Sequence, residues 1–270
     1  MRRLGLWLGG GLVALVVLMA LLSLVWTPHD PTLVVAGQRL QGPSAEHWLG
    51  TDGMGIDVFS RILVGAQTTI VVGVVSVSIA ALIGVPLGMV AGQVGGWVDE
   101  VVMRVTDIAY AFPALLLAIL LAARFGASPV TAMTAIGLAT IPSFARVTRA
   151  GTKQVISTDF VLAARASGTR WPGVSLRHVL PNIAPLIGVQ ASVTFAMAIL
   201  AEAALSYLGL STAAIVPTWG KMLRDAQSVM FNAPLQAVWP GLAIAIAVLG
   251  FNLLGDGLRD LLDPRLREVT

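Results

Sequence analysis

Long apolar segments alternate with shorter polar segments along most of this 270-residue chain. A helix needs about 20 apolar residues to cross the hydrocarbon core of a bilayer. The pattern predicts membrane spans at about 4–26, 68–94, 101–123, 129–144, 183–208 and 235–254. The third and fourth are the weakest, because Asp107 interrupts the third and the fourth has few strongly apolar residues. We expect an all-α, polytopic membrane protein with six transmembrane helices, forming a single transmembrane domain over residues 1–270.

The amino-acid composition also indicates a membrane environment. Hydrophobic residues make up 56% of the chain and charged residues only 11%, whereas a soluble domain carries roughly 25% charged residues. The chain has no cysteine, which excludes disulfides, thiolate metal sites and cysteine nucleophiles. The apolar run 4–26 exceeds the roughly 7–15 residues of a signal-peptide core, so a retained signal-anchor helix is predicted.

A polar stretch at 145–182, between the fourth and fifth predicted spans, gathers positive charge. It holds six of the 17 Lys and Arg residues and a single carboxylate, Asp159. Cytoplasmic loops of membrane proteins carry an excess of Lys and Arg. With this loop and both termini in the cytoplasm, twelve basic residues lie inside and five outside. We predict that orientation, with 27–67 and 209–234 outside and able to form short helices there. Lipid contact explains the chain better than nucleic-acid binding, because the net charge of +3 follows the positive-inside rule.

The same loop is predicted to contain a short, well-bounded helix. Three basic residues recur at helical spacing and extend the fourth span beyond the membrane: Arg146, Arg149 and Lys153. The Ser-Thr-Asp sequence at 157–159 offers N-cap side chains, and Gly168 suits the left-handed position that ends a helix. The helix Phe160–Ser167 between them has small side chains that allow another surface to approach. Prolines at 172, 181 and 185 then punctuate the return to the membrane. Docking of a partner and contact with anionic headgroups both remain open from the residues alone.

Glycines and prolines mark the packing of the spans. Four glycines at four-residue spacing form a flat face on the second span: Gly84, Gly88, Gly92 and Gly96. Such a face allows close helix approach, either within the bundle or against a partner chain. Kinks are expected at Pro86, Pro113 and Pro142.

The chain lacks the motifs of several enzyme classes. Neither of its two lysines stands in a phosphate-binding P-loop, and no HExxH pair or Gly-x-Ser-x-Gly elbow is present. We therefore expect a chain that is not an enzyme by itself. Glu202 is the one acid clearly inside a span, and such residues are functional by default. It either pairs with Arg224, Lys221 or backbone amides as a structural or gating group, or lines the substrate path.

The polar loop resembles a known motif. Ala163-Ala164-x3-Gly168, nine residues, and then x-x-Leu180-Pro181 are similar to the EAA loop of bacterial ABC importer permeases, although Leu162 replaces the usual Glu and His178 the usual Ile. In that family the loop is the coupling helix that sits in a cleft of the cytoplasmic ATPase. The resemblance implies the following ATPase-coupling residues: Asp159, Phe160, Leu162, Ala163, Ala164, Arg165, Gly168, Leu180 and Pro181.

The resemblance extends nearly from end to end. Matching segments are HWLGTDGMGIDVFSRILVGA from His47, GGWVDEVVMRVTDIAYAFP from Gly95, ILAEAALSYLGL from Ile199, PTWGKML from Pro217 and VLGFNLLGDGLRDLLDPRLR from Val248. They are similar to the second permease subunit of dipeptide, oligopeptide and nickel importers, the dipeptide type being the best fit. One departure is Ile56, where that branch usually has Arg.

The resemblance implies a type I ABC importer permease fold in a bacterial cytoplasmic (inner) membrane. The expected partners are a homologous permease, two ATPase subunits and an extracytoplasmic substrate-binding protein. This chain would bind no cofactor, because ATP and Mg²⁺ belong to the ATPases. Within that family Asp99, Arg104 and Asp107 would contact the ATPase or brace the second and third spans. Alternatives are a permease for nickel or another small solute, an ion-coupled secondary transporter, and a structural scaffold.

Overall fold

A computed structural model describes residues 2–211 and 216–262 of the chain. Within these residues the chain is almost entirely helical. The elements are α1 (Arg2–Val25), a 3₁₀ turn η1 (Ala36–Gln38), α2 (Val58–Val94), α3 (Gly96–Ala111), α4 (Ala114–Phe125), α5 (Pro129–Ile156), α6 (Asp159–Ala166), α7 (Trp171–Gly173), a π-helical turn η2 (Val174–Val179), α8 (Leu180–Tyr207), α9 (Trp219–Gln227) and α10 (Leu235–Leu262).

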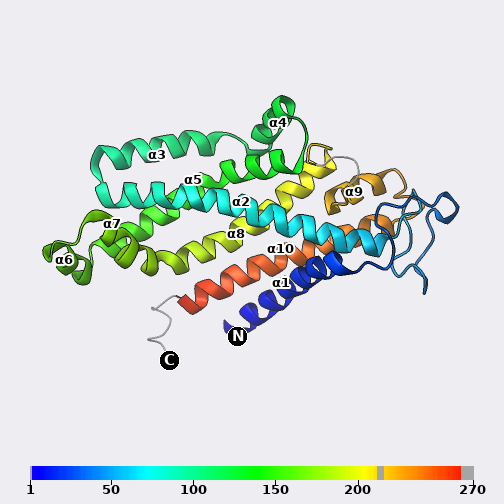
Figure 1. Cartoon of the computed structure of the whole chain (residues 1–270), viewed down its shortest axis with the longest axis horizontal. Coiled ribbons are helices and arrows are strands. Elements are labelled where there is room, and N and C mark those ends of the chain that lie inside the picture. The colour runs from blue at the N-terminus through cyan, green and yellow to red at the C-terminus, as the bar shows by residue number, and fades with distance from the viewer. Residues whose placement is uncertain (1, 212–215, 263–270) are drawn as a thin grey trace.

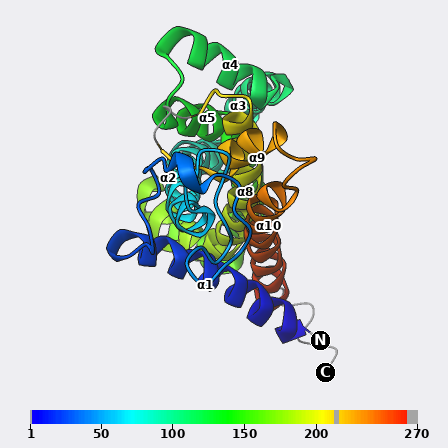
Figure 2. The same cartoon turned by 90° about the vertical axis from the view of Figure 1, so that its right-hand side faces the viewer.

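The long helices run side by side along the long axis of the molecule (Figure 1). We name its two extremities by the short helices that mark them. The α6 end carries α6 and α7, and the α9 end carries α9 together with the segment 26–57. The start of α1 and the end of α10 both lie toward the α6 end. Seen from the α9 end, α1 and α4 lie on opposite sides of the bundle (Figure 2).

Five helices of the described residues are long and apolar enough to cross a membrane, and a sixth span is obtained if α3 and α4 are taken as one broken span. The region predicted as a span at 101–123 is divided between these two helices. The two helices meet at 78°, because Phe112 and Pro113 adopt extended backbone conformations between them. A residue before proline is disfavoured in the α region, so the kink expected at Pro113 becomes a break.

Several helices extend beyond the predicted spans. Helix α2 begins at Val58 rather than near residue 68, because the Asp57 carboxylate accepts a 2.7 Å hydrogen bond from the Ser60 amide and caps the helix. The return to the fifth span, predicted as proline-punctuated chain, is helical from Trp171 to Tyr207. Its π-helical turn ends at Val179, two residues before Pro181, and the helix continues through the proline. Helix α10 also continues past residue 254.

The glycine face of α2 packs inside this chain. A Cβ atom added at Gly84 would lie 2.6 Å from the Phe144 Cβ atom of α5, and one at Gly92 would lie 2.7 Å from the Thr152 Cβ atom. Gly88 makes the same close approach to α5, whereas Gly96 faces open space. Three of the four glycines therefore serve the α2–α5 contact, one of the two alternatives left by the sequence.

Two apolar clusters bear on the functional regions. The larger joins α1, α2, α8, α9 and α10, and it includes Trp219, whose indole donates a 3.0 Å hydrogen bond to the Ile62 carbonyl. In the same cluster the Phe195 and Phe251 rings stack with centroids 3.9 Å apart. The second cluster lies at the α6 end and consists of Met89, Val161, Val174, Val179 and Ile183.

Candidate functional site

The predicted short helix is present as α6, and its C-terminus is closed as expected. Gly168 has φ +85°, and its amide donates to the Arg165 carbonyl at 3.0 Å. The Thr169 amide donates to the Ala164 carbonyl, also at 3.0 Å. This pair of bonds is the Schellman arrangement, which satisfies the last carbonyls of a helix.

The predicted side-chain N-cap of α6 is wrong, because the hydroxyl of the N-cap residue Thr158 accepts no hydrogen bond from the helix amides. The Thr158 hydroxyl donates to the Val155 carbonyl at 2.6 Å, and the Ser157 hydroxyl donates to the Gln154 carbonyl at 2.9 Å. These hydroxyls therefore donate to carbonyl groups in the last turn of α5. Two residues separate the end of α5 from the start of α6. The α6 amides of Val161 and Leu162 bond instead to the Thr158 carbonyl, each at 3.1 Å.

One side chain anchors α6 while its neighbours face outward. Val161 is fully buried among Met89 of α2, Val174 and Val179 of η2, and Ile183 of α8. By contrast, Phe160 is 47% exposed and Leu162 is 50% exposed. The exposed predicted residues of this helix, here called the α6 face, are Asp159, Phe160, Leu162, Ala163 and Arg165.

The remaining predicted coupling residues lie around the α6 face. Gly168 and Pro181 are exposed, and Ala164 is half-buried. Leu180 packs against the apolar cluster that contains Val161, so it contributes to the packing beneath α6. The structure thus brings the predicted coupling residues to one end of the molecule, and their contact with an ATPase stays a prediction.

Ion pairs tie α3 to α5 beside this surface. Asp99 of α3 is buried and accepts hydrogen bonds from Arg149 (2.7 Å from Nη2) and Lys153 (2.7 Å) of α5. Arg146 of α5 pairs with Asp107 of α3 at 2.7 Å. The basic extension predicted to run into water is therefore held by α3 carboxylates. The brace runs between α3 and α5 rather than between the second and third predicted spans.

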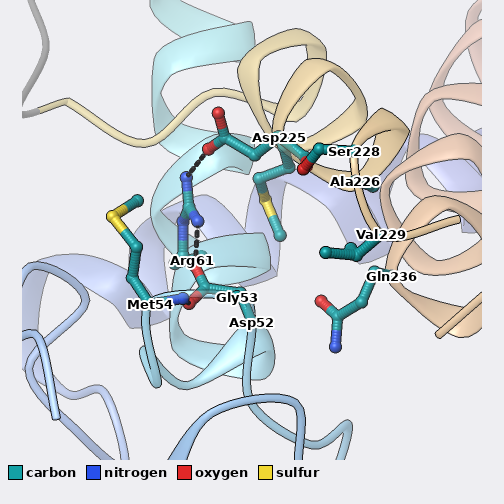
Figure 3. Close-up of a pocket in the computed structure, with 10 residues that line it drawn as sticks. Asp52, Gly53, Met54, Arg61, Asp225, Ala226, Ser228, Val229 and Gln236 are labelled. Atoms are coloured by element: carbon teal, nitrogen blue, oxygen red, sulfur yellow. Dashed lines mark hydrogen bonds and ion pairs between the residues drawn. The ribbon is translucent and has the colours of Figure 1, made fainter. Parts of the chain in front are cut away.

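At the α9 end a buried arginine joins three segments (Figure 3). The Arg61 side chain, in the first turn of α2, is only 4% exposed and pairs with Asp52 of the preceding loop and with Asp225 of α9 (3.1 Å). The Asp52 carboxylate also accepts from the amides of Met54 (2.8 Å) and Ile56 (2.9 Å). This arrangement joins the two segments that were predicted to lie outside the membrane, 27–67 and 209–234.

A cavity of about 260 Å³ opens beside Arg61. Its lining comes from the 52–61 region, from α9 and its C-terminal extension, and from Gln236 of α10, whose amide donates to the Thr51 carbonyl at 2.7 Å. Burial lowers the pKa of the nearby Lys221 ammonium, and the Asp225 carboxylate opposes that shift. The sequence reasoning missed this network, because Arg61 and Asp225 lie 164 residues apart.

Glu202 is buried in α8 and is held by hydroxyl groups. Ser206 donates to its carboxylate at 2.7 Å, and Ser211 lies at 3.5 Å. The Thr218 hydroxyl, at the N-cap of α9, bonds to the Ser206 hydroxyl at 2.9 Å. Among the described residues these hydroxyls, rather than Arg224 or Lys221, are its hydrogen-bond partners. The geometry supports a structural role in fixing the connection from α8 to α9.

Comparison with known proteins decides the class of this chain. Residues 84–268 match the family described as "Binding-protein-dependent transport system inner membrane component". The chain belongs to this family. It is 42% identical over 253 residues to the dipeptide transport system permease protein DppC of Alkalihalophilus pseudofirmus, covering 93% of this chain and 83% of the relative. It is 40% identical over 260 residues to the glutathione transport system permease protein GsiD of Pectobacterium atrosepticum, covering 96% and 86%.

A solved structure supports the fold. The chain is similar to a chain of the MetNI methionine ABC transporter in inward-facing conformations, with a TM-score of 0.61 and 18% sequence identity. The match covers 78% of this chain and 96% of the other. The all-α importer permease fold predicted from the sequence is therefore confirmed.

As an inner membrane component of a binding-protein-dependent system, the chain is a permease subunit of an importer rather than an enzyme. Partner subunits are implied by this class, since the transport depends on a binding protein.

Proposed function

We propose that this chain forms half of the translocation pathway for small peptides in a bacterial inner membrane. A homologous permease would supply the other half, two ATPase subunits would hold ATP and Mg²⁺, and an extracytoplasmic binding protein would deliver the substrate. The substrate class is supported by the names of the relatives, which specify a dipeptide and glutathione, itself a peptide.

The α6 face is proposed as the ATPase contact of this subunit. It presents two apolar side chains, Phe160 and Leu162, to solvent at the extremity of the molecule. Apolar side chains grouped on an exposed surface mark interaction sites. The Schellman closure at Gly168 and the buried Val161 give the helix a fixed position from which to receive a partner.

Movement of α6 would reach the membrane through packed contacts. Val161 shares its apolar cluster with Met89 of α2 and Ile183 of α8, and both of these helices run toward the α9 end. Close-packed interiors transmit displacement because they have little free volume. ATP-driven closure of the ATPases would thus shift α2 and α8 together and change access to the pathway.

The opposite extremity is proposed as the surface that receives the binding protein. The segment 26–57 and α9 lie side by side there, and the Arg61 ion pairs make them one unit. Under this proposal the α6 end, the start of α1 and the end of α10 lie on the cytoplasmic side, in agreement with the charge asymmetry.

The observation that carries the proposal is the exposed α6 face on an internally anchored helix. Its test is Ala163→Trp in the complex assembled with its partners, with uptake and substrate-stimulated ATPase activity as readouts. We expect both activities to fall at least tenfold, because the bulky ring would hold the ATPase away. Ala127→Trp, at an exposed alanine between α4 and α5, is the matched control. Survival of both activities in Ala163→Trp would show that α6 is not the docking helix.

The peptide assignment has a separate test. Binding of a panel of dipeptides, tripeptides and nickel chelates to the cognate binding protein should show the highest affinity for peptides. A preference for the chelates would replace the peptide assignment and leave the coupling assignment intact.

A further inference from the structure

A second polar cluster lies at the α9 end, apart from Arg61, and it contains two of the three histidines. The His47 Nδ1 atom lies 2.9 Å from the Asp57 Oδ1 atom, and the His29 Nδ1 atom lies 3.7 Å from the same oxygen. The two imidazole rings are 4.5 Å apart between centroids. One ligand atom from each residue lies within 4.8 Å of the others.

Hydrogen bonding within the protein does not satisfy these imidazoles. His47 is 3% exposed and its Nδ1 atom already faces Asp57, but the buried Nδ1 atom of His29 has no hydrogen-bond partner among the described residues. Buried polar groups are normally paired, so each exception requires an explanation. A hydrogen bond between His47 and Asp57 accounts for the position of the His47 Nδ1 atom. It does not account for the position of the His29 Nδ1 atom near the same carboxylate oxygen.

The donor set matches a divalent transition metal. Imidazole nitrogen and carboxylate oxygen are ligands of zinc and its neighbours, with bonds of about 2.0–2.2 Å. In a tetrahedral site of that size, adjacent ligand atoms lie about 3.3 Å apart. The two histidine-to-carboxylate separations of 2.9 Å and 3.7 Å lie on either side of this value, and all three ligand atoms lie within 4.8 Å of one another. Closing the three atoms around an ion would therefore need only local side-chain movement.

A second set of contacts orients the carboxylate. The Asp57 Oδ2 atom accepts from the Ser60 amide (2.7 Å) and the Ser60 hydroxyl (2.8 Å), which leaves Oδ1 directed at the histidines. The same hydroxyl oxygen accepts a 3.1 Å hydrogen bond from the His29 amide. Metal sites depend on such outer contacts to fix their ligands. The His29 side chain is 36% exposed, which gives an ion a route from the solvent.

We propose that His29, His47 and Asp57 form a binding site for one divalent transition-metal ion of the zinc type. The ion clamps the connection after α1 and the loop before α2 onto the first turn of α2. Three protein ligands leave a fourth position for water. The site lies beside the surface proposed for the binding protein, but its existence does not depend on the transported substrate or on the α6 assignment.

The test uses the purified complex after chelator treatment, with Zn²⁺ followed by calorimetry and Co²⁺ followed by visible absorption. The wild type is expected to bind one more ion than His47→Ala and to show the strong visible bands of tetrahedral Co²⁺. His178→Ala, at the histidine in η2 near the α6 end, is the matched control and should keep both signals.

Two further variants separate loss of the site from loss of the fold. Asp57→Asn keeps a side chain that can cap α2 but removes the charged ligand, and His29→Gln alters a partly exposed residue. Each should weaken Zn²⁺ binding at least tenfold while leaving the metal-free unfolding temperature nearly unchanged. Equal binding by the wild type and all three site variants would overturn the proposal, as would loss of the signal in His178→Ala.

Discussion

The two ends of the molecule hold their charged groups in different ways. At the α9 end, the Arg61 side chain is 4% exposed and joins two carboxylates from separate segments. At the α6 end, the basic partners of α3 are 31% to 43% exposed, and α6 itself is attached through the apolar contact of Val161. The α9 end is therefore fastened internally, whereas the α6 end keeps apolar and charged groups available to a partner.

This difference has an energetic basis. Removing one partner of a buried ion pair leaves an uncompensated charge and is strongly destabilising. Exposed pairs contribute little, because water screens them and long side chains lose entropy. Substitutions at the α9 end should consequently change stability, while substitutions on the α6 face should change assembly and transport.

The largest effect on stability is expected from Arg61→Ala. It leaves Asp52 buried without its cation and should lower the free energy of unfolding by about 3 kcal/mol. Thermal unfolding of the purified subunit in detergent is the measurement. The control is Arg104→Ala, whose pair with Glu100 is exposed on both sides and should leave the unfolding temperature unchanged. Equal unfolding temperatures for the two variants would contradict the claim that ion pairs stabilise the α9 end more than the α6 end.

Asp99→Ala should give a smaller loss, of about 2 kcal/mol, because it removes charged hydrogen bonds whose basic partners are partly solvated. The same unfolding measurement applies, with Asp107→Ala in an exposed pair as the control. A loss as large as that of Arg61→Ala would mean that the α6 end is fastened as tightly as the α9 end.

Val161→Ala sharpens the comparison at the α6 end. Two buried methyl groups are removed, at about 0.8 kcal/mol for each, so a loss of about 1.5 kcal/mol is expected. The anchoring of α6 should weaken too, and substrate-stimulated ATPase activity should fall more than basal activity. Val105→Ala, at an exposed valine of α3, serves as the control for both measurements. An unchanged stimulation ratio would contradict the anchoring role of Val161.

The smallest change in stability is expected for the double substitution Phe160→Ser and Leu162→Ser. Both side chains are exposed, so the free energy of unfolding should stay within about 0.5 kcal/mol. Recovery of the ATPase subunits with the tagged permease should nevertheless fall at least tenfold. Full recovery of the ATPases would contradict the assignment of the α6 face.

The sequence was sufficient for features that depend on local pattern. Apolar length indicated the spans, and the positive φ of Gly168 follows from its place after a run of helix formers. The early start of α2 also had a local signal, since Asp57 precedes the apolar run in the position of an N-cap residue. The predicted span at 68–94 covers only the most apolar part of the helix, which begins ten residues earlier, at Val58.

Other features depend on the assembled fold and had no local signal. Pro113 indicated a bend, but the angle between α3 and α4 depends on how α3 packs against α2 and α5 and how α4 packs against α5 and α8. The two partners of Arg61 are far apart in the sequence: Asp52 precedes α2 and Asp225 lies in α9. Only the packing of α9 on α2 brings them together. The hydroxyls of Ser157 and Thr158 had two sets of backbone partners within reach, and the proximity of α5 determined which set they joined.

Thiol accessibility tests the central claim that the α6 end is the ATPase contact. The chain has no cysteine, so Leu162→Cys and Phe231→Cys each give this subunit one reactive thiol. Phe231, between α9 and α10, is 96% exposed and provides the control. With a membrane-impermeant maleimide, Leu162→Cys should react in inside-out vesicles stripped of the ATPases and be protected when they are bound, while Phe231→Cys should react only from the opposite face. Equal labelling of Leu162→Cys with and without the ATPases would contradict the account.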